Sequence, residues 1–195
     1  MSVPEAILQE AARVQLALCT ADVVELAALR GRAAELAQRA AARALALPAL
    51  GRVRMSPSRL VLSVRPERWL IVGPVASPGA SAALWQAAGA DAGVAVDLSS
   101  ALAALQLAGP AAGELLSRGC RLDLDPRVFA VGSAAATQVA QVAVILARLP
   151  SGMLLLTPAT TAQHLREWLA AAGQPFGLAL RADVTVAALC GDEAV

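Results

Sequence analysis

The sequence predicts an α+β fold built from two units that repeat one order of elements. Apolar residues make up 57% of the 195-residue chain and charged residues 16%, which is ample for a hydrophobic core and too apolar for disorder. The apolar spacing changes between the two-residue period of strands and the helical period, in the order strand, helix, strand, strand, helix, strand. That order is typical of a ferredoxin-like split βαβ unit, and because it occurs twice, we expect two such units packed together.

The first unit is expected at residues 23–98. Its first helix shows apolar residues at helical spacing and ends before Pro48, which cannot continue a helix. Residues 49–59 are rich in turn formers, and residues 65–68 form a hairpin turn between two strands. The predicted strands are 23–30, 60–64, 69–72 and 93–98, and the predicted helices are 31–47 and 80–88.

The second unit is expected at residues 99–176. Pro110 suits the first position of a helix, and Gly119 is expected to end that helix in the left-handed conformation. Thr160 and Gln163 match a capping box at the start of the next helix. The predicted strands are 101–107, 134–139, 143–148 and 153–156, and the predicted helices are 110–118 and 160–172.

The two ends of the chain are expected to lie outside these units. Residues 1–22 are predicted to form an N-terminal arm, in which residues 13–20 alternate like a strand. Residues 177–195 are predicted to form a C-terminal tail with one weak strand at 184–189.

Composition excludes several classes of protein. The net charge is +1 with scattered basic residues, so the sequence offers no basic patch for nucleic acid. No uncharged run reaches the ~18–20 residues of a membrane-spanning helix, and Glu5 and Glu10 argue against a signal peptide. The three isolated cysteines fit a reducing compartment, so we expect a soluble cytoplasmic protein.

The high apolar share also predicts an exposed apolar surface. With 16% charged residues, a small two-lobed fold has too few polar side chains to cover itself, so its apolar patch should exceed that of a typical monomer. The expected contributors are two alanine-rich helix faces and two segments near the chain ends, at residues 33–44, 80–88, 3–8 and 184–189.

Few residues suggest chemistry. All 16 basic residues are arginine, so no lysine can form a Schiff base, and there is no tyrosine. His164 is the single histidine, and a surface or interface role is favoured over catalysis because no nucleophile or carboxylate is paired with it in sequence. The cysteines are too far apart in sequence for a metal motif.

Three further features have a catalytic and a structural interpretation. Cys120 follows a helix end, where the dipole disfavours a thiolate, so a buried small hydrophobe is preferred over a nucleophile. Asp123 and Asp125 project to one face like paired carboxylates, yet Asp125-Pro126 is a common turn opener. The glycine run 73–79 lacks the spacing of a phosphate loop, and residues 69–72 are a buried strand. We therefore predict no catalytic, cofactor-binding or metal residue.

One ordered set of short motifs resembles a known family. Residues 97–132 contain, in order, Asp-Leu-Ser (97–99), Ala-Gly-Pro (108–110), Gly-Cys (119–120), Leu-Asp-Leu (122–124), Pro126, Phe129 and Gly132. Upstream, residues 68–74 resemble the family's tryptophan-containing strand. The set is similar to the gamma subunit of heterotetrameric sarcosine oxidases, a relative of the glycine-cleavage T-protein fold, and the resemblance spans roughly residues 24–176.

The positions at which this sequence departs from the wider T-protein family also favour a gamma subunit. Its folate-binding members carry acidic residues on a glycine-rich strand pair, whereas residues 142–148 here are apolar and free of carboxylates. Its iron–sulfur-related branch continues Gly-Cys with a different motif, whereas here Arg121-Leu122-Asp123 follow. The resemblance thus implies the fold without the folate or cysteine chemistry.

The resemblance implies a fold like the N-terminal part of aminomethyltransferase and a small non-catalytic subunit. The complex would oxidatively demethylate an N-methyl amino acid. The alpha subunit would hold NAD and tetrahydrofolate, the beta subunit FAD, with FMN between them, and a delta subunit zinc. The main partner would be the alpha subunit. Two alternatives stay open: a stand-alone folate-binding aminomethyltransferase-like protein and a homomeric structural protein.

Overall fold

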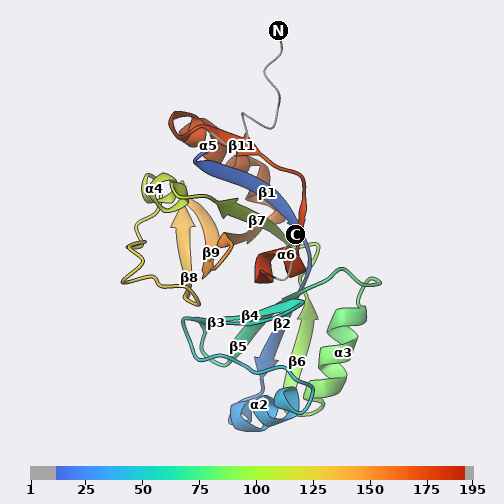
Figure 1. Cartoon of the computed structure of the whole chain (residues 1–195). Coiled ribbons are helices and arrows are strands. Elements are labelled where there is room, and N and C mark those ends of the chain that lie inside the picture. Colours follow the sequence, from blue (N-terminus) through green and yellow to red (C-terminus); the bar gives the residue numbers. More distant parts are fainter. Residues whose placement is uncertain (1–11, 192–195) are drawn as a thin grey trace.

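The computed structural model describes residues 12–191 and consists of two β-sheets stacked face to face, with helices on both outer surfaces (Figure 1). The upper sheet in Figure 1, sheet A, has the order β11-β1-β7-β10-β9-β8, with β12 also pairing β1. The lower sheet, sheet B, has the order β3-β4-β5-β2-β6. Helices α4 and α5 cover sheet A, and helices α2 and α3 cover sheet B. Mixed α and β architecture is therefore confirmed.

Sheet B is formed by the contiguous first unit, and all its neighbouring strands are antiparallel. Its central strands β4 and β5 carry apolar residues on both faces, because one face meets the helices and the other meets sheet A. In β5, Trp69 and Ile71 pack toward the helices, whereas Leu70 and Val72 pack toward sheet A. The elements are β2 (Asp22–Ala28), α2 (Ala33–Ala41), β3 (Arg52–Ser56), β4 (Arg59–Arg65), β5 (Arg68–Gly73), α3 (Ala80–Gly89) and β6 (Gly93–Asp97).

Sheet A combines the second predicted unit with both ends of the described chain. Strand β1 pairs antiparallel with β7 and parallel with β11 and β12. The elements are β1 (Val14–Thr20), β7 (Leu102–Ala108), α4 (Ala112–Ser117), β8 (Ala134–Val139), β9 (Val142–Leu149), β10 (Gly152–Pro158), α5 (Ala162–Gly173), β11 (Leu178–Leu180), β12 (Val184–Thr185) and α6 (Val186–Cys190), with single 3-10 turns at Ala159–Thr161 and Gln174–Phe176.

The structure therefore differs from the predicted domain boundaries at 1–22 and 177–195. Val14 and Leu16 of the predicted arm lie in the core beneath α5, and the predicted tail supplies β11, β12 and α6. The position beside β7 is taken by β1 and not by the strand that follows α5. The second unit is thus not a contiguous split βαβ repeat. Residues 1–11 lie outside the described residues.

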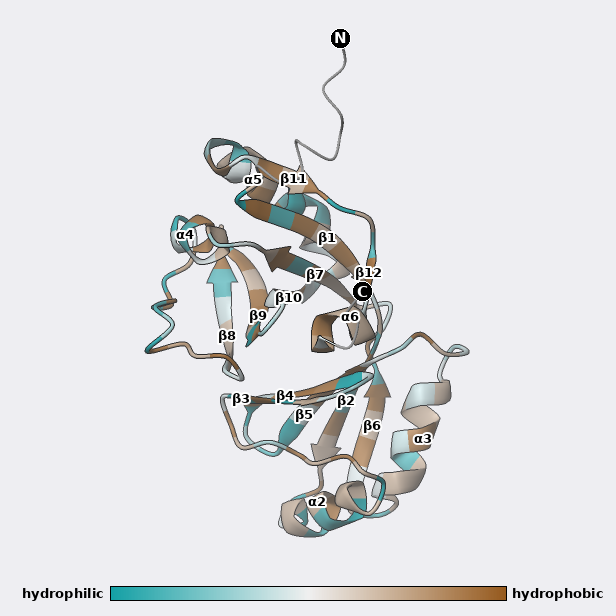
Figure 2. Cartoon of the chain, in the orientation of Figure 1, coloured by the Kyte–Doolittle hydropathy of each residue, from teal (hydrophilic) through white to brown (hydrophobic). Residues whose placement is uncertain are grey.

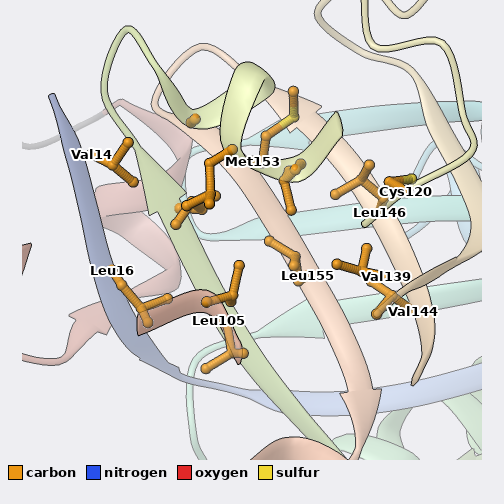
Figure 3. Packing of buried hydrophobic residues seen from close by; sticks show 14 of the residues in the cluster. Val14, Leu16, Leu105, Cys120, Val139, Val144, Leu146, Met153 and Leu155 are labelled. Carbon is orange, nitrogen blue, oxygen red and sulfur yellow. The ribbon is translucent and has the colours of Figure 1, made fainter. Parts of the chain in front are cut away.

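Three apolar layers hold the molecule together. The first lies between sheet A and helices α4 and α5, and Figure 3 shows part of it, including Leu105, Leu155 and Cys120. The second lies between the two sheets and includes α6, through Val186 and Leu189. The third lies between sheet B and helices α2 and α3. In Figure 2 brown, hydrophobic stretches lie on strands of both sheets and on α6 between them.

Two elements of the first unit differ from the sequence prediction. Helix α2 ends at Ala41 and not at residue 47, because Ala44 adopts a left-handed conformation (φ 56°) and Leu45 N–H donates to Ala40 O at 3.0 Å, which closes the helix in a Schellman-type turn. Strand β3 lies inside the stretch predicted as turns. The alternation of Val53 and Met55, which pack against the layer between the sheets, is its sequence signal.

The predicted strand at 184–189 is largely a helix. Only Val184–Thr185 pair with β1, and α6 follows directly. Thr185 Oγ1 accepts a hydrogen bond from Ala188 N–H at 3.3 Å, which is an N-cap that the sequence analysis missed. Val186 and Leu189 are buried one turn apart, so this segment does not contribute to an exposed apolar patch, contrary to the prediction.

Three predicted helix signals in the second unit are wrong. The capping box at Thr160 and Gln163 is not formed, since Gln163 donates to Glu167 Oε1 and α5 starts after a 3-10 turn. Helix α4 starts at Ala112 and not at Pro110. Gly119 is also not left-handed; its lack of a side chain is required by the Trp168 ring, which a Cβ atom would meet at 2.6 Å.

We predict that Gly119→Ala destabilises the chain by about 1–3 kcal/mol, because the added methyl must displace the buried side of Trp168. Gly113→Ala is the matched control. A Cβ there meets nothing nearer than 3.9 Å, so this variant should be neutral or gain up to ~1 kcal/mol of helix propensity. Pulse proteolysis in urea measures both. Equal stability of the two variants would contradict the close approach of Trp168.

Candidate functional site

The Asp97–Ser99 motif forms the corner at which the chain passes from sheet B to sheet A. Ser99 Oγ accepts a hydrogen bond from the N–H of buried Val23 at 3.0 Å, and Leu98 N–H donates to Val23 O at 2.8 Å. Asp97 Oδ1 accepts from Ser99 N–H at 2.9 Å. The hydrogen bonds from the Ser99 side chain and backbone lower the pKa of Asp97. The motif is therefore a turn that fixes the crossover.

The motifs from Gly119 to Gly132 form the long connection between α4 and β8. Leu124 and Phe129 anchor it in the core beneath α4. At its end, Gly132 N–H donates to Arg148 O at 2.8 Å, while Val53 N–H donates to Gly132 O at 2.8 Å. The connection thus joins β9 of sheet A to β3 of sheet B by backbone hydrogen bonds.

A cleft of about 800 Å³ opens beside this connection. Three segments line it: residues 109–117, which include α4; residues 122–126 together with Val131; and residues 148–153, which form the turn between β9 and β10. Its charged lining side chains are Glu114, Asp123, Asp125 and Arg148. The cleft brings residues of the Ala-Gly-Pro and Leu-Asp-Leu motifs and Pro126 together in one place.

Arg148 is the charged group with the least favourable surroundings in the cleft. Its Nη2 donates to Leu124 O at 2.6 Å, whereas its Nε is buried without a hydrogen-bond partner among the described residues. Burial lowers the pKa of Arg148, and the nearby Asp125 carboxylate only partly opposes this.

The two aspartates have structural partners, as the structural interpretation predicts. Asp123 Oδ1 accepts from Asp125 N–H at 2.9 Å. Asp125 receives two hydrogen bonds from the Arg127 guanidinium, at 2.9 and 2.8 Å, and these bonds lower the pKa of Asp125. Val128 and Phe129 N–H both donate to Asp125 O, so Asp125 opens a turn.

The three cysteines lie in or against the apolar layers. Cys120 is buried, and its Sγ lies 3.6 Å from Thr137 Oγ1, which confirms the prediction of a buried side chain. Burial, and to a smaller extent the neighbouring Cys190 thiol, raises the pKa of Cys19 to about 12. Over residues 12–191, no group of three His, Cys, Asp or Glu side chains could hold a metal ion.

His164 is exposed on α5 and borders a hollow of about 490 Å³ with Trp168 and the β8–β9 turn. In that turn Ala140 and Gln141 both adopt left-handed backbone conformations. The interface role of His164 stays a prediction.

The glycine run 73–79 borders a smaller hollow of about 210 Å³ between sheet B and α3. The Asp22 carboxylate accepts hydrogen bonds there from Ala76 N–H at 3.0 Å and Ser81 Oγ at 2.8 Å. Because a carboxylate already occupies these donors, the arrangement disfavours a phosphate, in agreement with the sequence analysis.

Sequence analysis did not single out Glu114 and Arg148. Both lie in ordinary helix and strand patterns, and only the fold brings α4 next to the end of β9. The signal available in sequence was weak: Arg148 is the one charged residue in the otherwise apolar stretch 142–149.

Comparison with solved structures defines the class of fold. The aminomethyltransferase T of the Bartonella henselae glycine cleavage system aligns with a TM-score of 0.66 over 96% of this chain and 53% of that chain, at 16% identity. A chain of the heterotetrameric sarcosine oxidase from Corynebacterium sp. U-96, solved with pyrrole 2-carboxylate, aligns with a TM-score of 0.75 at 31% identity, over 89% of this chain and 93% of that chain. The protein therefore has an aminomethyltransferase-related α+β fold.

Curated relatives define the family. Sarcosine oxidase subunit gamma of Corynebacterium sp. strain U-96 is 35% identical over 143 residues, 72% of this chain and 69% of the relative. The same subunit of an Arthrobacter species is 36% identical over 110 residues, 56% of this chain and 54% of the relative. The chain spans little more than half the length of the first relatives that it matches. No protein-family profile matches. The chain belongs to the sarcosine oxidase gamma-subunit family.

We predict that Ser99→Ala costs about 1–3 kcal/mol, because it leaves the buried Val23 N–H without its acceptor. Ser100→Ala, an exposed neighbour, should change stability by less than about 0.5 kcal/mol. Because the pKa of Asp97 is lower in the folded chain than in the unfolded chain, the Asp97 carboxylate stabilises the fold at a pH above its unfolded pKa. This stabilisation is lost as the pH falls through the folded pKa. The deficit of Ser99→Ala should therefore shrink on acidification from pH 6 to pH 3 in urea titrations. A constant deficit would contradict the link to Asp97.

We also predict that iodoacetamide labels Cys190 first in the folded chain. Cys190 is the least buried of the three cysteines, whereas Cys120 is buried and Cys19 is buried with a raised pKa of about 12. Mass spectrometry of labelled peptides reads out the order. Rapid labelling of Cys120 under native conditions would contradict its assignment as an inert core side chain.

Proposed function

We propose that this chain is the small non-catalytic gamma-type subunit of a flavin-dependent, heterotetrameric sarcosine oxidase-like complex in the cytoplasm. The complex would oxidatively demethylate an N-methyl amino acid. The observation that carries the proposal is the alignment with 93% of a chain of heterotetrameric sarcosine oxidase, together with 35% identity over 69% of a curated gamma subunit.

The geometry of the motif residues supports a subunit without its own chemistry. Asp97, Ser99, Asp125 and Gly132 form turns and joints between the two sheets. Cys120 is a core side chain. In this proposal FAD, FMN, NAD, zinc and tetrahydrofolate belong to the alpha, beta and delta subunits, and the alpha subunit is the main partner.

Exposed apolar side chains support a subunit that is covered in a complex. Examples are Val128 and Leu180, each 65% exposed, and Val131, which is 54% exposed. Two of them lie in the α4–β8 connection, on the left in Figure 1. No helix within residues 12–191 is long and apolar enough to span a membrane.

The alternative, a stand-alone folate-binding aminomethyltransferase-like protein, is less well supported. The chain covers 53% of the solved aminomethyltransferase T, so about half of that protein has no counterpart in the alignment. Strand β9, where the resemblance leads us to expect folate-binding carboxylates, alternates between the two apolar layers through Val144, Ile145 and Leu146.

Co-expression tests the proposal. With the alpha, beta and delta subunits from its own genome, the tagged chain should be soluble and co-purify with them in a yellow complex. Without them it should aggregate or be degraded, because its exposed apolar side chains stay uncovered. The separated chain should carry no flavin, nicotinamide or metal, as read by absorbance and elemental analysis. A stable monomer with full thermal stability, or stoichiometric flavin in the chain alone, would contradict it.

A further inference from the structure

In the cleft between α4, residues 122–126 and the β9–β10 turn, the partly buried Arg148 guanidinium is only partly compensated by the nearby Asp125 carboxylate. Over residues 12–191, the Arg148 guanidinium forms no ion pair, whereas Arg127 is already paired with Asp125 at 2.8 Å. A partly desolvated charge without a partner costs free energy unless an opposite charge approaches it. The inner end of the cleft therefore favours a carboxylate from outside the chain.

The exposed acidic side chains of the cleft favour a positively charged group. Glu114 on α4 and Asp123 on the facing segment are both exposed, and neither forms an ion pair in the described part of the chain. A simple anion would be repelled by these two carboxylates on its way to Arg148, because like charges a few ångströms apart repel one another near a protein surface. The occupant must therefore carry a basic group near its carboxylate.

The size and remaining lining of the cleft indicate a peptide segment. A volume of about 800 Å³ lies in the range of about 300–1,000 Å³ that is typical of ligand pockets, and it has room for more than one residue of a peptide. Three exposed prolines, Pro110, Pro126 and Pro150, lie along its lining and fix the backbone of the surrounding turns. Val131, 54% exposed, adds an apolar contact at the edge.

We propose that this cleft docks an extended segment of a partner subunit, with a carboxylate of that segment on Arg148 and an adjacent lysine or arginine between Glu114 and Asp123. The inference rests on the proposed function, because the occupant belongs to the complex. It assigns Glu114, Asp123 and Arg148 as the recognition residues of the subunit. The charges on both sides are complementary, which sets register and orientation as well as affinity.

Co-purification of the assembled complex tests the docking site. Arg148→Gln, which keeps a donor for Leu124 O, and the double variant Glu114→Gln/Asp123→Asn should each lower recovery of the partner subunit at least tenfold in 150 mM salt. Arg43→Gln and Asp183→Asn, exposed and outside the cleft, are the single-charge controls and should co-purify like wild type. Folded variants that still recover the full amount of partner would overturn the docking site.

A second measurement covers the case in which Arg148→Gln fails to fold. Ser117→Cys places a thiol in the cleft at an exposed position, and its maleimide labelling should be at least tenfold slower in the complex than in the freshly separated chain. Equal labelling rates would show an empty cleft and overturn the inference alone. If wild-type chain recovers no partner at all, the proposed function fails, and the docking site fails with it.

Discussion

The apolar layer between the two sheets is the contact on which the rest of the structure depends. The central strands β4, β5, β9 and β10 are buried on both faces. Each sheet alone would therefore expose one apolar face to water. Each buried Leu or Val side chain contributes about 1.5–3 kcal/mol relative to exposure. Because α6 inserts Val186 and Leu189 into this layer, the C-terminal segment is needed to fill it.

Two backbone connections keep the sheets in register across that layer. The Asp97–Ser99 corner attaches the crossover to β2, and Gly132 binds both Val53 and Arg148 through its peptide groups. Buried peptide groups need partners, so these bonds also satisfy donors that a free sheet edge would expose. The family-like motifs are thus explained first by folding.

The connection that ends at Gly132 also lines the cleft, and in this way it relates the fold to the proposed function. The α4–β8 connection is held at both ends, by Leu124 in the core and by Gly132 between the sheets. Between these points it presents Asp123, Pro126 and Val131 beside the end of β9. In the proposed function, the chain would offer this charged surface to a partner from elements that are anchored by the core and by backbone hydrogen bonds.

The sequence by itself determined the elements and the family. Apolar periodicity located most helices and strands, because local spacing reflects which face is buried, as in β5 and β9. Only the tertiary structure decided where the two terminal segments belong: β1 pairs with β11, although Val14 and its partner Leu178 are 164 positions apart in the sequence (178 − 14). It also decided that the Trp168 ring leaves no room for a side chain at Gly119, and that Glu114, Asp123 and Arg148 line one cleft. Such relations depend on long-range packing, for which a local pattern carries no signal.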